Sequence, residues 1–130
     1  MPKQIFQTDK APAPIGPYNQ AVKANGFIFF SGQVALIPAT GELEVSSIEA
    51  ETHQVMKNIS ALLDETHVTF QHIVKTTIFL SDIGLFAKVN EVYGSYFTGT
   101  GDHPARETVA VKGLPRGVNV EISITAVVDL

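Results

Sequence analysis

The sequence predicts a single α+β domain in which a mixed sheet of about six strands carries two helices on one face. Its 130 residues, 45% of them hydrophobic, can bury one core but are too few for two ordinary domains. Six segments have the alternation or the composition of strands, and two have the apolar spacing of helices. We therefore expect residues 1–130 to form one domain.

Strands are expected at residues 4–8, 18–24, 27–36, 73–81, 105–111 and 119–128. Asn25-Gly26 separates the second from the third and tolerates the positive φ values of a tight turn, which predicts a hairpin. In the last segment apolar residues alternate with a polar set that begins at Glu121. If the last two segments also pair as a hairpin, Arg106 and Glu121 meet on one polar face of the sheet.

Apolar stripes with helical spacing run through residues 48–63 and 86–97. Ser46 and Glu49 have the spacing of a capping box at the start of the first stripe. Ser81 or Asp82 can cap the second. Both segments are therefore predicted to be helices with defined starts.

The face of the sheet away from the helices needs a partner, because two helices can cover only one face. Its expected residues are of mixed character: Arg106, Thr108, Glu121, Ser123 and Val127. A mixed surface of this kind favours burial between subunits over open exposure. The sequence thus predicts an oligomer, without its number of subunits.

Composition argues against several functional classes. A net charge of -4 with only two arginines provides no basic surface for a phosphate backbone, so we expect no nucleic-acid partner. No apolar run is long enough for a membrane span and the start lacks the pattern of a signal peptide, which predicts a cytoplasmic protein without a membrane partner. Cysteine is absent and the four histidines are dispersed, so neither thiol catalysis nor a metal site is expected.

Arg106 is the first candidate for a substrate anchor. A planar guanidinium can hold a carboxylate through two parallel hydrogen bonds, which the lysines that supply most of this chain's positive charge cannot do. An ion pair between Arg106 and Glu121 or Glu107 is the structural alternative.

Several motifs resemble those of the Rid family, the YjgF-like reactive-intermediate deaminases, over essentially the whole chain. They are Ile15-Gly16-Pro17-Tyr18, Ser31-Gly32-Gln33, Asn90, Pro104-Ala105-Arg106, Leu114-Pro115 and Val120-Glu121-Ile122. The resemblance implies a chorismate-mutase-like fold, a homotrimer with clefts between neighbours, and no cofactor. It also implies an enzyme of the 2-iminobutanoate/2-iminopropanoate deaminase type. Such an enzyme hydrolyses enamines and imines such as 2-aminoacrylate and its 2-imino acid tautomer to a 2-keto acid and ammonia.

In that reaction Arg106 would hold the substrate carboxylate, helped by a backbone N–H near Ser31 or Gly32. Glu121 would either position water and pass a proton to departing ammonia or only steady Arg106, and beside Arg106 it is expected to stay ionised. Thr108 stands where deaminating members commonly have cysteine, so a thiol nucleophile is excluded there.

Two further residues are less specific. The Tyr18 hydroxyl can donate at the cleft, although packing is the commoner role for such an aromatic. Asn90 is expected to cap or bridge rather than to carry chemistry, although the resemblance places it with the substrate-binding residues.

Three alternative functions remain open. A module that binds or senses small keto or imino acids would have the same site without turnover. Some relatives of the resembled family are linked to translation inhibition and RNA cleavage, which the acidic charge balance disfavours. Removal of Met1 would expose Pro2 as the secondary amine of a tautomerase, but no other part of the chain is similar to that class.

Overall fold

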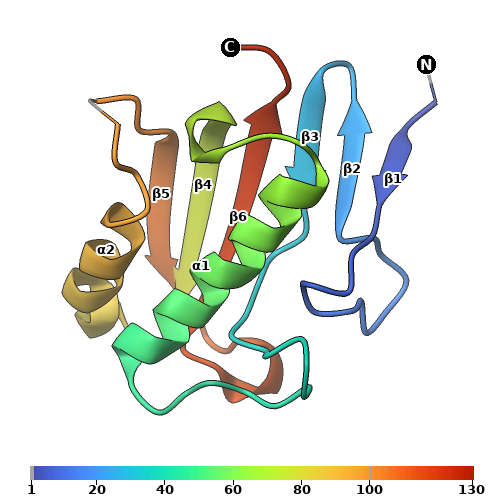
Figure 1. The fold of residues 1–130 in the computed structure, drawn as a ribbon. Helices are drawn as coiled ribbons and strands as arrows, with labels where there is room; N and C mark the ends of the chain where they lie inside the picture. Colours follow the sequence, from blue (N-terminus) through green and yellow to red (C-terminus); the bar gives the residue numbers. More distant parts are fainter. Residues whose placement is uncertain (1, 100) are drawn as a thin grey trace.

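The computed structural model describes residues 2–99 and 101–130 and consists of a six-stranded sheet with two α-helices packed on one face (Figure 1). The strands are β1 (Gln4–Phe6), β2 (Ala21–Ala24), β3 (Phe27–Phe30), β4 (Ile73–Leu80), β5 (Ala105–Ala110) and β6 (Val120–Val127). The helices are α1 (Ile48–Glu65), α2 (Phe86–Gly94) and the short 3-10 turns η1 (Phe70–His72), η2 (Ile83–Leu85) and η3 (Pro115–Gly117). The predicted α+β class is confirmed, with every expected strand and helix present.

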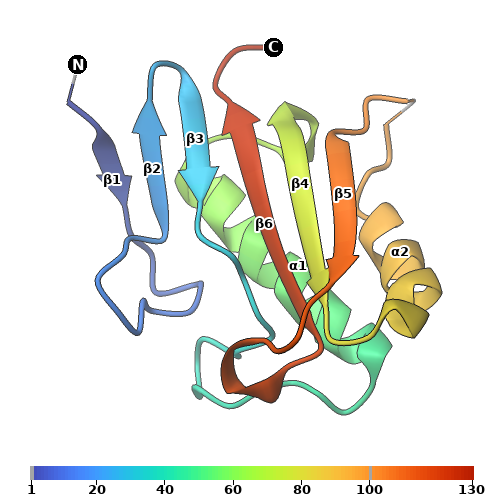
Figure 2. The same cartoon turned by 180° about the vertical axis from the view of Figure 1, so that it is seen from behind.

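The strand order is β1-β2-β3-β6-β4-β5, as the view from the uncovered face shows (Figure 2). The predicted hairpin of β2 and β3 is confirmed, and its turn has positive φ at Asn25 (52°) and Gly26 (79°). The predicted hairpin of β5 and β6 is wrong: β4 lies between them, parallel to β5 and antiparallel to β6. Because α2 carries the chain back across the sheet from β4, β5 runs in the same direction as β4.

The register assigns Arg106 and Glu121 to opposite faces of the sheet. Thr76 of β4 pairs with Arg106, and it is fully buried under the helices, so Arg106 points to the helix-covered side. Glu121 pairs with Phe79, which points the other way. The expectation that Arg106 and Glu121 share one polar face is therefore wrong. Thr108 shares the face of Arg106 and so also lies on the helix-covered side. The error came from assuming the wrong neighbour for β5.

The core lies between the sheet and α1. Alternate residues of β6 are buried as predicted, and they pack with the apolar stripe of α1. The start of α1 differs from the expectation, because Ser47 and not Ser46 is the cap: its hydroxyl accepts the Ala50 N–H at 3.0 Å. Ser46 instead donates to the Glu44 carboxylate. Asp82 caps the short turn η2 before α2, where it accepts the Gly84 N–H.

The other face of the sheet carries no helix (Figure 2). Phe27 and Phe29 stack there at a ring-centroid distance of 6.2 Å and are 43% and 50% exposed. Lys75 and Glu107 form an ion pair at 2.8 Å on the same face. No helix in the described part of the chain is both long enough and apolar enough to cross a membrane.

Candidate functional site

The guanidinium of Arg106 is held by one face of α2. Its Nη1 donates to Asn90 Oδ1 at 2.8 Å, and its Cζ lies 5.6 Å from the Phe86 ring centroid and 5.3 Å from that of Tyr93. These three helix residues are four and three positions apart, so they face the strand together. Cation–π contacts and one amide therefore orient the guanidinium without neutralising it.

Neither predicted ion pair of Arg106 forms in the part of the chain that the structure describes. Glu107 pairs with Lys75, and Glu121 is on the opposite face. Because no carboxylate of the described residues neutralises it, the arginine can accept an anion from outside the chain. Asn90, expected to cap or bridge rather than to carry chemistry, accepts a hydrogen bond from Arg106 through its side-chain carbonyl oxygen.

A cleft of about 440 Å³ opens at this arginine, and we refer to it as the Arg106 cleft. Its lining residues are Asn90, Tyr93, Gly94, His103, Pro104 and Arg106. The Tyr93 hydroxyl donates to Thr76 Oγ1 at 2.9 Å, and burial raises the pKa of this phenol. Tyr93 is therefore a fixed, neutral wall of the cleft. Thr108 lies two residues along β5, and its buried hydroxyl has no hydrogen-bond partner among the described residues.

Glu121 lies beside Gly32 on the uncovered face of the sheet. A Cβ atom at Gly32 would lie 2.7 Å from Glu121 Oε2, so only glycine leaves room for the carboxylate. Burial raises the pKa of the Glu121 carboxyl. The expectation that Arg106 keeps this group ionised is wrong within one chain, because the arginine is on the other face. A carboxyl with a raised pKa accepts a proton more readily than an ordinary carboxyl does.

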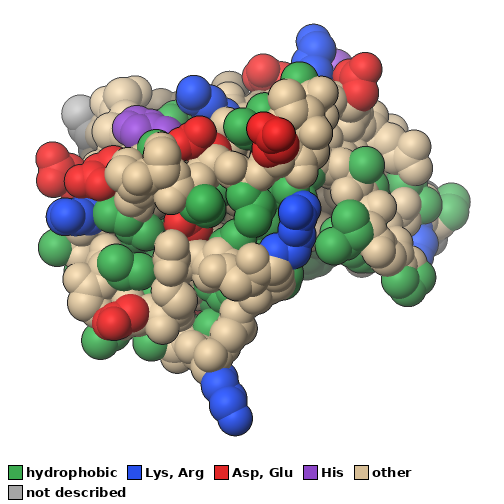
Figure 3. Space-filling model, turned by 90° about the horizontal axis from the view of Figure 1, so that it is seen from below, with side chains coloured by type: hydrophobic (Ala, Val, Ile, Leu, Met, Phe, Trp, Pro, Cys, Tyr) green, Lys and Arg blue, Asp and Glu red, His purple; other side chains and the backbone are tan. Residues whose placement is uncertain are grey.

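A second cleft, of about 370 Å³, surrounds this carboxyl and is called the Glu121 cleft below. Polar residues on its wall are Tyr18, Gln20, Ser31, Gln33, Arg116 and Glu121, beside Gly32. Apolar ones are Pro12, Ala13, Ile15, Val34, Leu36 and Pro115. Figure 3 shows the end of the molecule where β6 begins, with hydrophobic side chains lining a hollow and a basic side chain at its margin.

The two backbone N–H groups predicted as donors near this cleft, those of Ser31 and Gly32, differ in whether they already have a hydrogen-bond partner. The Ser31 N–H donates to the Gln20 carbonyl at 3.0 Å, and the Ser31 hydroxyl donates to the Asn19 carbonyl at 2.5 Å. The Gly32 N–H has no partner among the described residues and remains available. The Tyr18 hydroxyl accepts a long 3.4 Å bond from the Ile15 N–H, which leaves its own proton free to donate.

Two buried polar side chains of α1 hold the segments that flank Glu121 and Gly32. The Glu51 carboxylate accepts the backbone N–H groups of Asn119 at 2.7 Å and Val120 at 3.0 Å. The Asn58 amide donates to the carbonyls of Val34 at 3.0 Å and Leu36 at 2.9 Å. Sequence reasoning missed both, although polar residues seven positions apart inside an apolar stripe were the available signal.

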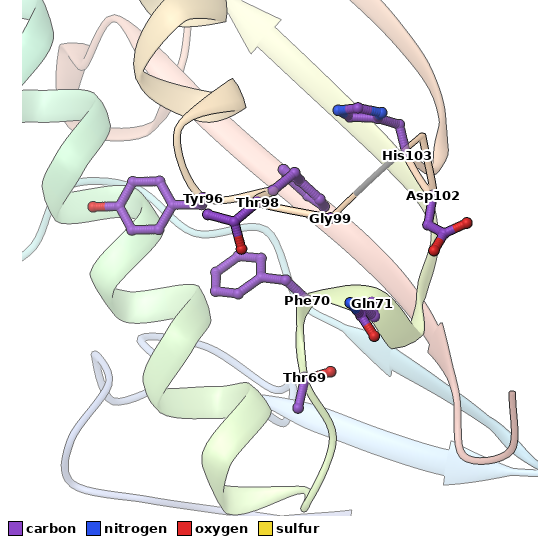
Figure 4. Close-up of a pocket in the computed structure, with 9 residues that line it drawn as sticks. Thr69, Phe70, Gln71, Tyr96, Thr98, Gly99, Asp102 and His103 are labelled. Atoms are coloured by element: carbon purple, nitrogen blue, oxygen red, sulfur yellow. The ribbon is translucent and has the colours of Figure 1, made fainter.

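A further hollow of about 350 Å³ lies between η1 and the segment that follows α2 (Figure 4). Phe70, Tyr96 and His103 are among its lining residues. The aromatic side chains here mainly contact one another, with Phe70 edge-on to Phe97 at 5.4 Å. None of the residues predicted to form the functional site lines this hollow, so the two clefts above remain the candidates.

Comparison with known proteins identifies relatives along nearly the whole chain. A family model described as Endoribonuclease L-PSP matches residues 8–128. A mouse protein named 2-iminobutanoate/2-iminopropanoate deaminase is 43% identical over 125 residues, which cover 96% of this chain and 91% of that protein.

Solved structures give the same result. The protein YyfA from Yersinia pestis, described as a member of the conserved Rid family, superposes with a TM-score of 0.94 at 46% identity, covering 98% of this chain and all of that one. Escherichia coli TdcF, solved with bound serine, has a TM-score of 0.89 at 35% identity and covers 95% of this chain and 98% of its own.

Proposed function

Because this chain belongs to the Rid family, whose family model is described as Endoribonuclease L-PSP, we propose that it hydrolyses reactive 2-imino acids and their enamine tautomers to 2-keto acids and ammonia. The name of the mouse relative supports this substrate class. The observation that carries the proposal is the pairing of chemical types: an arginine not neutralised by any described carboxylate, and a carboxyl whose pKa is raised. The arginine can anchor the substrate carboxylate, and the carboxyl can carry protons during the reaction.

One chain cannot apply both groups to the same small molecule, because Arg106 and Glu121 lie on opposite faces of the sheet. The active site is therefore formed between two copies, with the Arg106 cleft of one facing the Glu121 cleft of the next. A homotrimer closes such a head-to-tail contact into a ring. The exposed, stacked Phe27 and Phe29 on the uncovered face support self-association, since an apolar surface of this kind favours a partner.

The reaction then follows from the groups in the two clefts. Arg106 holds the carboxylate, and the Gly32 N–H can bind one of its oxygens. Glu121, as carboxylate, takes a proton from water while the water oxygen bonds to the iminium carbon, which yields a neutral amine and a hydroxyl on one carbon. The protonated Glu121 returns that proton to the amine. The carbon–nitrogen bond breaks as the hydroxyl becomes a carbonyl, and the hydroxyl proton passes through Glu121 to the departing ammonia, so one iminium and one water give one keto acid and one ammonium ion.

A mixing experiment tests the site between copies. Arg106→Ala and Glu121→Gln chains, each inactive alone, are denatured together and refolded as mixed oligomers. A site is intact only where an Arg106 from one copy meets a Glu121 from the next, so random mixing restores about one quarter of wild-type activity. A site within one chain would give none. Turnover is measured as ammonia and keto acid released from 2-iminobutanoate made by an amino-acid oxidase.

Assembly is tested separately by light scattering. We expect a stable oligomer, with the mass of three chains, at micromolar concentration. A monomer with full imine-hydrolysing activity would overturn the site between copies. Incubation of the same protein with RNA is the comparison for nuclease activity: RNA cleavage without imine hydrolysis would overturn the proposed reaction.

A further inference from the structure

Arg116 is the one other arginine of the chain, and it lies in η3 on the wall of the Glu121 cleft. Among the described residues its guanidinium has no ion pair, and the side-chain hydrogen bond that an arginine donates there is that of Arg106. Glu121 is the only acidic residue that lines the same cleft. The cleft therefore contains a cation whose charge no described carboxylate neutralises.

The backbone at Arg116 favours a different residue. Its φ of 58° and ψ of 18° place it in the left-handed region, which glycine and asparagine adopt more easily than arginine. The turn is closed by the Gly117 N–H to the Leu114 carbonyl at 3.0 Å and by the Val118 N–H to the Pro115 carbonyl at 3.3 Å. Since the backbone does not require arginine, the strained position is consistent with a use for its side chain.

The cleft wall suits a short chain of methylene groups that ends in an anion. Apolar side chains, among them Ile15, Val34 and Leu36, line it together with Arg116 and Glu121. A guanidinium binds a carboxylate through charge-assisted hydrogen bonds, and Arg116, exposed on the cleft wall, is open to an incoming anion.

We propose that Arg116 binds a second carboxylate on the substrate, so that the enzyme accepts 2-imino acids with an acidic side chain of one or two methylene groups. This inference rests on the proposed function above. The neighbouring copy's arginine holds the first carboxylate, Glu121 serves the imine carbon, and the side chain extends along the apolar wall to Arg116. The chemistry is unchanged: one imine and one water give one keto dicarboxylic acid and one ammonia.

The test compares kcat/KM for two imines made in place by oxidases, 2-iminoglutarate with an acidic side chain and 2-iminobutanoate with a neutral one. Arg116→Gly removes the cation and relaxes the left-handed backbone, so we expect no loss in melting temperature. The ratio of kcat/KM between the acidic and the neutral substrate falls at least about tenfold. Arg116→Lys keeps part of the ratio, because it retains charge without the planar fork. Lys112→Ala is the matched control, an exposed cation of the same loop that is outside the cleft lining, and it leaves the ratio unchanged.

An unchanged ratio in Arg116→Gly would overturn the assignment, as would an equal fall in Lys112→Ala. Wild-type protein that hydrolyses 2-iminobutanoate but not 2-iminoglutarate would overturn this inference and leave the proposed function standing. Failure of both substrates would overturn the proposed function itself.

Discussion

The two clefts hold their charged groups in opposite ways. In the Arg106 cleft the guanidinium is packed against two aromatic rings and fixed by an amide, so its position is set before a ligand arrives. In the Glu121 cleft the carboxyl has a glycine beside it and no described ion pair, and burial raises its pKa. Within one chain, the sheet between the two groups prevents them from neutralising each other. Each group therefore has no ion pair with the other in its own chain and is left to meet its counterpart on a neighbouring copy.

Arg106→Lys tests whether the Arg106 cleft needs a guanidinium in a fixed position or only a positive charge. It keeps one positive charge but loses the planar fork, the amide contact and much of the stacking. We expect kcat/KM for 2-iminobutanoate to fall at least tenfold, on the order of 2 kcal/mol in transition-state binding. Circular dichroism and light scattering are expected to match the wild type. Unimpaired turnover would remove Arg106 from the site.

Glu51→Ala addresses the support of the Glu121 cleft. Removing this buried carboxylate leaves the N–H groups of Asn119 and Val120 without an acceptor, which we expect to lower the free energy of unfolding by roughly 2–5 kcal/mol. Urea denaturation measures the change. Glu49→Ala, an exposed acid in the first turn of the same helix, is the control and is expected to cost less than about 1 kcal/mol. Equal losses in the two variants would show that Glu51 is no special support.

Glu121→Gln tests whether the carboxyl of the Glu121 cleft acts as the base. The amide keeps the size and hydrogen bonding of the side chain but cannot carry the proton, so kcat falls more than KM changes if Glu121 is the base. If it only steadies substrate binding, KM rises with the loss of rate. In the wild type, the acid limb of the pH–rate profile is expected above the ordinary pKa of a carboxyl, because burial raises the pKa of Glu121. An acid limb at the ordinary value would assign it to another group.

Glu121→Gln is also expected to change how the stability of the fold depends on pH. Because the pKa of Glu121 is raised on folding, its contribution to stability is present below its unfolded pKa and is lost as pH rises through the folded pKa. Glu121→Gln is therefore expected to gain stability relative to the wild type at neutral pH and not at low pH. Glu107→Gln is the control, for which the opposite pH dependence is expected. Lys75 lowers the pKa of the Glu107 carboxyl, so the contribution of this carboxyl to stability is lost as pH falls.

Each cleft also has a glycine, and the two differ in the space around them. An added Cβ at Gly32 meets Glu121 Oε2 at 2.7 Å, whereas at Gly94 it meets nothing within 4 Å. Gly32→Ala is expected to displace the flexible carboxylate, so that activity falls while stability changes by less than about 1 kcal/mol. Gly94→Ala, at the end of α2, is expected to stabilise by about 0.5 kcal/mol with activity retained. A fully active Gly32→Ala would show that the carboxylate position is not critical.

Local patterns predicted the elements well because their causes are local. The alternation in residues 120–128 assigned the buried face of β6, and Asn25-Gly26 located a real turn. The neighbour of β5 was missed because alternation shows which residues of a strand share a face, without identifying the adjacent strand. Placing Arg106 beside Glu121 failed for the same reason.

The candidate site was predictable residue by residue, and its assembly was not. Every predicted site residue except Thr108 lines one of the two clefts. Ser31 does so with both of its donors occupied, and Thr108 lies two residues from Arg106 on β5. The roles of Glu51 and Asn58 depend on contacts with residues far away in the chain, which no local window contains.

The central position of β6 has a consequence for how the chain folds during synthesis. β6 follows every other strand in the sequence, yet it is the strand that joins β3 to β4. Until it emerges from the ribosome, β1–β3 and β4–β5 are two separate sheet fragments, each with an unpaired edge facing the gap. We therefore expect the insertion of β6 between these two edges to be a late step of folding, and chaperone binding or misassembly to concentrate before it.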